Sequence, residues 1–146
     1  MIQRIQSIFL LLAAMAFGAL LAFPMASTPT AGTDLIFADQ EYTVQDNVAL
    51  LILTIAGLVL ALAAIFLYGK RSLQLRLSYL LIVICIVLPL VAYLFFTNQA
   101  SVMSAEQSVH DELGLFLPFV GLICVILAAR FIRKDDRLVK SMDRLR

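Results

Sequence analysis

Four long stretches of the chain contain no Asp, Glu, Lys, Arg or His, and this distribution of charge constrains the fold more than any other feature. The stretches cover residues 5–33, 47–69, 77–105 and 113–129. A hydrocarbon core of about 30 Å takes roughly 20 apolar residues, and lipid satisfies no backbone polar group, so each crossing must be a helix. The sequence therefore predicts an all-α integral membrane protein with four transmembrane helices in an up-down bundle.

The composition agrees with this prediction, because 62% of the 146 residues are hydrophobic and only 14% are charged. Soluble domains average about 25% charged residues. A chain of this length holds one domain, so we predict a single membrane domain over residues 1–146. The predicted spans are residues 5–26, 48–69, 77–97 and 113–130; the outer loops are 27–47 and 98–112; the cytoplasmic loop is 70–76 and the cytoplasmic tail is 131–146.

The charged residues predict the orientation of these spans. All 11 Lys and Arg residues lie before the first span, between the second and third, or after the fourth. The two other loops hold seven of the 10 acidic residues and no basic one. Because Lys and Arg beside a span are retained on the cytoplasmic side, both termini are predicted to be cytoplasmic, in a bacterial inner membrane.

A signal peptide is the competing interpretation of the first 26 residues. Its apolar region is typically about 7–15 residues long and is followed by a small-residue cleavage site. Here the apolar run is longer, and no A-x-A site precedes Ser27. We therefore predict a retained first helix.

Both predicted outer loops contain patterns of local structure. Residues 35–37 and 42–44 are β-prone and flank a polar quartet, which is typical of either a short hairpin or an irregular loop with aromatic side chains at the interface. In the second loop, residues 104–107 match a capping box, which predicts that the fourth helix begins outside the membrane. On such a helix Glu106 and His110 share a face, a weak metal-ligand pattern that solvated charge explains better.

The spans lack the residues that membrane chemistry usually requires. Apart from cysteine and tyrosine they contain no ionisable side chain, which disfavours a proton-coupled transporter. Cys85 and Cys124 stand alone rather than in a C-x-x-C pair, so buried free thiols are the default prediction, and the distance between them is open. No phosphate-binding glycine motif or catalytic triad is present. We predict that the chain is not an enzyme and holds neither a cofactor nor a metal.

Small residues and prolines predict how the helices pack. Small residues four apart allow helix backbones to approach closely in lipid, and a proline inside a span removes one helical hydrogen bond and kinks the helix. The predicted packing residues are Ala14, Gly18, Ala22, Gly57 and Ala61, and the predicted kinks are at Pro89 and Pro118. These faces meet either another span of this chain or a second protein.

The end of the chain keeps a helical period. An apolar stripe lies opposite most of the basic residues, and it consists of Phe131, Leu138, Met142 and Leu145. This pattern predicts an amphipathic helix that lies on the inner leaflet or packs on another protein. Basic residues beside a membrane are expected without nucleic acid, so we predict no nucleic-acid partner.

The two ends of the chain also carry a resemblance. Residues 1–7, MIQRIQS, and residues 129–146, which end in RFIRKDDRLVKSMDRLR, resemble a small family of uncharacterised four-span bacterial membrane proteins classed as a domain of unknown function. The resemblance covers the whole chain. It implies location in the inner membrane of a Gram-negative bacterium, and the family has no assigned activity to carry over.

Together these features predict a structural or accessory subunit of a membrane complex. Its partners are the lipid bilayer and other membrane proteins or further copies of the chain. One alternative is a transporter or channel component for a small neutral or apolar solute that uses the kinked spans. Another is an envelope sensor in which Glu106, Asp111 and Glu112 receive a signal at the outer loop.

Overall fold

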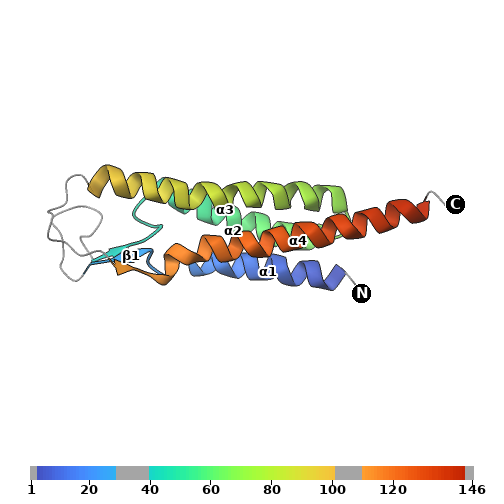
Figure 1. The fold of residues 1–146 in the computed structure, drawn as a ribbon, viewed down its shortest axis with the longest axis horizontal. Helices are drawn as coiled ribbons and strands as arrows, with labels where there is room; N and C mark the ends of the chain where they lie inside the picture. Colours follow the sequence, from blue (N-terminus) through green and yellow to red (C-terminus); the bar gives the residue numbers. More distant parts are fainter. Residues whose placement is uncertain (1–2, 29–39, 101–109, 144–146) are drawn as a thin grey trace.

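A computed structural model of the chain describes residues 3–28, 40–100 and 110–143. This part is all-helical apart from three two-residue strands, and Figure 1 shows it as an elongated molecule. The helices are α1 (Gln3–Ala19), α2 (Val48–Phe66), α3 (Arg71–Ala100) and α4 (Leu113–Asp143). The strands are β1 (Ala26–Ser27), β2 (Glu41–Tyr42) and β3 (His110–Asp111). We call the end with the strands the sheet end, and the opposite end, near both termini, the basic end.

The four helices lie side by side around a common core. α1 packs on α2 and α4, and α3 packs on the same two helices from the other side. Fully buried side chains from different helices fill the centre, among them Phe17, Leu50, Leu88 and Val125. The small residues Ala61 and Ala64 are also fully buried, which brings α2 close to its neighbours.

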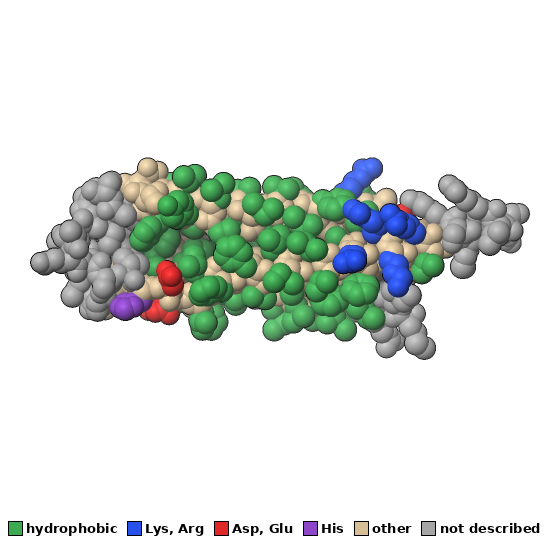
Figure 2. All heavy atoms as spheres, in the orientation of Figure 1, with side chains coloured by type: hydrophobic (Ala, Val, Ile, Leu, Met, Phe, Trp, Pro, Cys, Tyr) green, Lys and Arg blue, Asp and Glu red, His purple; other side chains and the backbone are tan. Residues whose placement is uncertain are grey.

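The outer surface of the helices is also apolar. Ile52 on α2, Val83 on α3 and Ile123 on α4 are 61%, 54% and 60% exposed. Hydrophobic side chains cover the middle of the molecule in Figure 2, whereas charged ones lie toward its ends. Three helices, α2, α3 and α4, are long and apolar enough to cross a membrane. These features are those of a membrane protein, because helices that are apolar on all sides are stable only in a large core or in lipid.

The first helix is shorter than its predicted span of residues 5–26. α1 has 17 residues and ends at Ala19. Its apolar part, Ile5–Ala19, is shorter than the apolar part of any other helix. The chain then forms tighter turns, in which the backbone N–H groups of Ala22 and Phe23 both donate to the carbonyl of Ala19. Pro24 has no N–H group to continue a helix. Hydropathy could not locate this end, because the turn residues are as apolar as the helix before them.

The link between α2 and α3 is shorter than predicted, and the predicted tail helix is continuous with the fourth span. α3 begins at Arg71, so most of the predicted 70–76 loop is helix and the link from α2 is only residues 67–70. α4 continues without a break from the predicted span through residue 143 of the predicted tail. Apolar residues mark only the part of a helix that lies in lipid, whereas Lys, Arg and Gln are good helix formers in water.

The strands form a small antiparallel sheet in the order β2-β1-β3. Ala26 pairs with Tyr42 on one side and with Asp111 on the other. Tyr42 thus pairs with the chain that follows α1, a pairing that was not predicted. The hairpin between residues 35–37 and 42–44, one of the two predicted alternatives, includes residues 35–37, which lie outside the described residues.

The prediction that the fourth helix already includes His110 is wrong. His110 and Asp111 form β3, and α4 begins at Leu113. The long-range pairing with β1 takes the backbone groups that a helix would have used. Ser104 and Gln107, on which the capping box depended, lie outside the described residues.

Candidate functional site

Backbone hydrogen bonds fasten the start of α4 to the chain that follows α1. The N–H of Glu112 donates to the carbonyl of Met25 over 3.1 Å, and the N–H of Gly114 donates to the carbonyl of Pro24 over 2.9 Å. A Cβ atom at Gly114 would overlap the Pro24 carbonyl, so this approach requires glycine. Ser27 Oγ adds a hydrogen bond of 2.7 Å to Glu112 Oε1. These three hydrogen bonds hold the start of α4 against the segment that follows α1.

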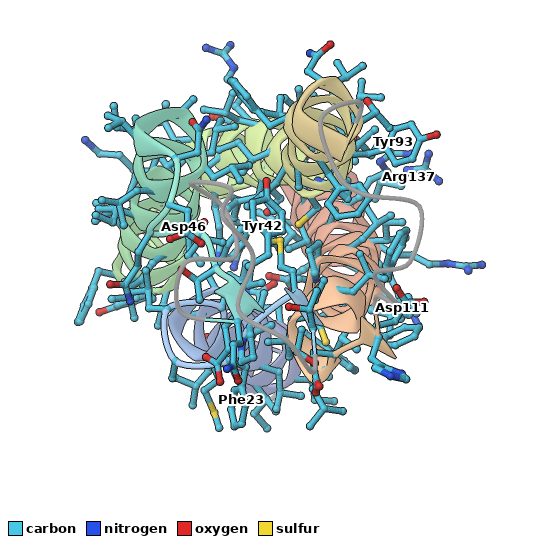
Figure 3. The ribbon with its side chains drawn as sticks, turned by 90° about the vertical axis from the view of Figure 1, so that its left-hand side faces the viewer. Phe23, Tyr42, Asp46, Tyr93, Asp111 and Arg137 are labelled. Carbon is cyan, nitrogen blue, oxygen red and sulfur yellow. The ribbon has the colours of Figure 1, made fainter. Side chains whose placement is uncertain are left out.

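Tyr42 closes the sheet end between the helices. Its side chain is only 4% exposed, and its hydroxyl donates to the carbonyl of Ala92 on α3 over 3.3 Å. Its ring lies 6.2 Å from that of Phe96. Burial, with a smaller contribution from Asp46, raises the pKa of Tyr42 to about 12, so the hydroxyl stays protonated at neutral pH. Figure 3 shows Tyr42 directed between the helices.

A pocket of about 220 Å³ lies beside Tyr42. It is formed by the strands, the middle of α3 and the first turn of α4, and its walls are mostly apolar. The lining residues are Met25, Ala26, Tyr42, Pro89, Ala92, Tyr93, Phe96, Asp111 and Leu115. Asp111 is the one acidic residue among them. Because its walls are mostly apolar, this pocket is suited to binding an apolar group.

The weak metal pattern is not assembled in the described part of the chain. His110 is exposed in β3 rather than on a helix face, and Glu106 lies outside the described residues. Within residues 3–28, 40–100 and 110–143, no group of three or more His, Cys, Asp or Glu side chains is placed to hold a metal ion.

The predicted small-residue faces are only partly used. A Cβ atom at Gly57 would overlap the buried ring of Phe17, so α1 and α2 do approach closely there, and Ala61 on the same face is fully buried. Ala14 is also buried, at 3% exposure. Gly18, however, has nothing within 4 Å of such a Cβ atom, and Ala22 is exposed in the turn after α1. The large residue in the contact comes from α1 and the small one from α2.

Both prolines lie inside helices that continue past them, Pro89 in α3 and Pro118 in α4. The two cysteines are free and buried. A Cβ atom at Gly121 would lie 3.6 Å from Cys85 Sγ, so Cys85 packs against α4 one turn from Cys124. Gly121 thus marks a close approach of α3 and α4 that we did not predict.

The basic end contains a layer of buried polar side chains that the sequence analysis did not predict. Arg71 Nε lies 2.9 Å from Asp135 Oδ2, which joins α3 to α4. Gln6 on α1 and Gln74 on α3 are fully buried, and neither side-chain amide has a hydrogen-bond partner among the described residues. The one available signal was Asp135, an acidic residue on the apolar side of an amphipathic helix.

Aromatic contacts hold α4 beside its neighbours at this end. The rings of Phe131 and Phe9 are stacked with centroids 5.6 Å apart. Arg133 donates a hydrogen bond to the Tyr79 hydroxyl, and its guanidinium carbon lies 5.7 Å from the Tyr79 ring centroid. Phe131, predicted as a docking residue, therefore packs partly inside the molecule.

Farther along α4, the predicted docking residues are less enclosed. Leu138 is 46% exposed. The side chain of Met142 and all of Leu145 lie outside the described residues.

One face of α4 is basic. This face carries an open groove of about 730 Å³, which is lined by Leu127, Arg130, Phe131, Arg133, Lys134, Arg137 and Leu138. Figure 2 shows Lys and Arg side chains gathered at this end of the molecule, with acidic side chains and the histidine near the other. This separation matches the charge pattern from which the orientation was predicted.

Comparison with known proteins bears on the whole chain. No curated protein and no solved structure matches it. A family model does match, and it confirms the membership of an uncharacterised family that the two terminal segments predicted. That model is described as a domain of unknown function, DUF4293, and covers residues 2–145, so the chain belongs to this family.

Proposed function

We propose that the chain is a bacterial inner-membrane protein that crosses the bilayer four times as an up-down bundle, with both termini in the cytoplasm. α1 supplies the first span together with the apolar turns up to Phe23, a reach of roughly 30 Å if helix spacing is used throughout. The separation of basic and acidic side chains along the molecule supports the orientation.

We propose further that it is an accessory subunit of a membrane complex and that the last turns of α4 bind the partner. The observation that carries this proposal is the length of α4, which has 31 residues and extends past the packed bundle at the basic end. A helix that leaves its neighbours gains little from propensity alone and is stabilised mainly by packing an apolar face. Leu138 lies on this extension and is 46% exposed.

The test is a double substitution in the full-length protein, Leu138→Asp with Met142→Asp. A tagged chain at native expression level is extracted in mild detergent, and mass spectrometry identifies what remains bound after size exclusion. A partner that binds the unmodified chain stoichiometrically should be lost from the variant, while membrane insertion is retained. The control is Lys140→Gln, which removes one positive charge at a position between the two substituted residues. Equal association of the variant and the unmodified chain contradicts docking through this face.

The pocket beside Tyr42 favours a second candidate, a transporter or channel component for a small neutral or apolar solute. Its walls include Pro89 on α3, where a helical hydrogen bond is missing, and Leu115 at the start of α4. The substitution Ala92→Leu fills the pocket, and Ala56→Leu adds the same volume on a half-buried position of α2. For a transporter, only the first variant lowers solute flux into liposomes that contain purified protein. Flux equal to that of empty liposomes for the unmodified chain rules this function out.

A further inference from the structure

The basic groove on α4 gathers positive charge on one face of the helix. Arg130, Arg133, Lys134 and Arg137 follow one another at helical spacing of three and four residues, so they lie along one stripe. No acidic residue lines the groove. Like charges at this spacing repel one another, and a bound anion removes that repulsion.

Two acidic residues of α4, Asp135 and Asp136, adjoin these cations in the sequence, and neither lines the groove. Asp135 is 9% exposed and is held by Arg71 of α3, on the side of the helix away from the groove. Arg133 contacts Tyr79 through both its guanidinium face and a hydrogen bond, which positions the side chain but leaves its charge in place. The groove therefore keeps four positive charges in a partly fixed arrangement.

Apolar side chains also line the groove, and they indicate which ligand fits it. Leu127, Phe131 and Leu138 line it together with the four cations. Toward the sheet end the same helix presents Ile123, which is 60% exposed, on its apolar surface. The cations begin at Arg130, directly after the apolar stretch of residues 113–129, which is the depth of a lipid headgroup. A free phosphate would use only the charges, whereas a phospholipid would use both surfaces.

We propose that this groove is a binding site for one anionic phospholipid, whose phosphate lies among Arg130, Arg133, Lys134 and Arg137 and whose acyl chain runs over Leu127 toward Ile123. The site goes beyond the subunit function, because its four cations and the acyl-chain surface at Leu127 and Ile123 precede Leu138, the one groove residue that the docking proposal also uses. Under the proposed orientation the lipid belongs to the cytoplasmic leaflet, where anionic lipids attract basic segments.

The experiment compares lipid retention by the purified full-length protein without any partner. The protein is incorporated into nanodiscs of equal amounts of phosphatidylglycerol and phosphatidylcholine, then released into detergent and analysed by native mass spectrometry. We expect one phosphatidylglycerol to be retained at least about tenfold more often than phosphatidylcholine. The double variant Arg130→Gln with Arg137→Gln should lose this preference about tenfold or more, because each basic residue near a membrane contributes to anionic lipid binding.

The matched control is Lys70→Gln with Arg76→Gln, which removes two charges from exposed residues at the same end but outside the groove. This control should keep the preference, and circular dichroism should show unchanged helix content in both variants. Equal loss in the two variants would mean a general attraction to negative surface and would overturn a defined site. Competition by inorganic phosphate at millimolar concentration would assign the groove to the free anion instead. Because no partner protein is present, these outcomes are independent of whether the end of α4 docks a subunit.

Discussion

At the scale of single residues, Tyr42 couples the sheet end to α3 through a buried hydroxyl. Its pKa of about 12 in the folded protein lies above the ordinary value of 10.0. Folding therefore favours the protonated form, and the stabilisation is fully present below pH 10 and is lost as the pH rises through the folded pKa. In an absorbance titration we expect Tyr42 to ionise near pH 12 and Tyr42→Phe to remove that step. Identical titration curves near pH 12 for the variant and the unmodified protein would contradict a buried Tyr42.

Unlike the Tyr42 hydroxyl, the side-chain amides of Gln6 and Gln74 are buried without a hydrogen-bond partner among the described residues. A buried polar group left unsatisfied costs about 1–3 kcal/mol, and leucine has a similar volume without that cost. We expect Gln6→Leu and Gln74→Leu each to raise the free energy of unfolding by about 1 kcal/mol or more. Thermal denaturation in detergent measures this effect. Lower stability of either variant would show that its amide is satisfied in the protein, by water or by the other glutamine.

At the scale of the helices and strands, the sequence predicted features that depend on one segment and missed features that depend on contacts between distant segments. The positions of the four helices follow from runs of apolar residues, which any one segment displays by itself. The sheet does not, because Ala26, Tyr42 and Asp111 meet only after the helices have packed. The ion pair between Arg71 and Asp135 was missed for the same reason: Asp135 lies on the apolar side of its helix, but nothing local to either residue identifies the other as its partner.

The contact between α1 and α2 gives a prediction at this scale. A methyl group at Gly57 would overlap the fully buried Phe17 ring, and overpacking of this kind costs about 1–3 kcal/mol. Gly18 is the matched control, because a Cβ atom there meets nothing within 4 Å and alanine is the better helix former by up to about 1 kcal/mol. We therefore expect Gly57→Ala to lower the melting temperature and Gly18→Ala to raise it slightly. Equal shifts in the two variants would contradict a close approach at Gly57.

At the scale of the whole molecule, the orientation indicated by the charged residues must agree with the number of times the chain crosses the membrane. The proposed four crossings would put the sheet on one side of the membrane, and both termini together with residues 67–70 on the other. A first helix that failed to cross would leave the N-terminus on the sheet side. The orientation of the complete chain therefore depends on α1, the shortest of the four helices and the one that falls below the length of the three clear spans.

Cysteine labelling in intact cells tests this arrangement. In a background of Cys85→Ala and Cys124→Ala, we expect Asp111→Cys to react with a membrane-impermeant maleimide added outside the inner membrane, because residue 111 is exposed in β3. Lys70→Cys, in the short link between α2 and α3, should react only after the membrane is permeabilised. A cysteine placed before Met1 should behave like Lys70→Cys if α1 crosses. Labelling of that N-terminal cysteine from outside, with the other two unchanged, would mean three crossings and an α1 that packs on the bundle without spanning the bilayer.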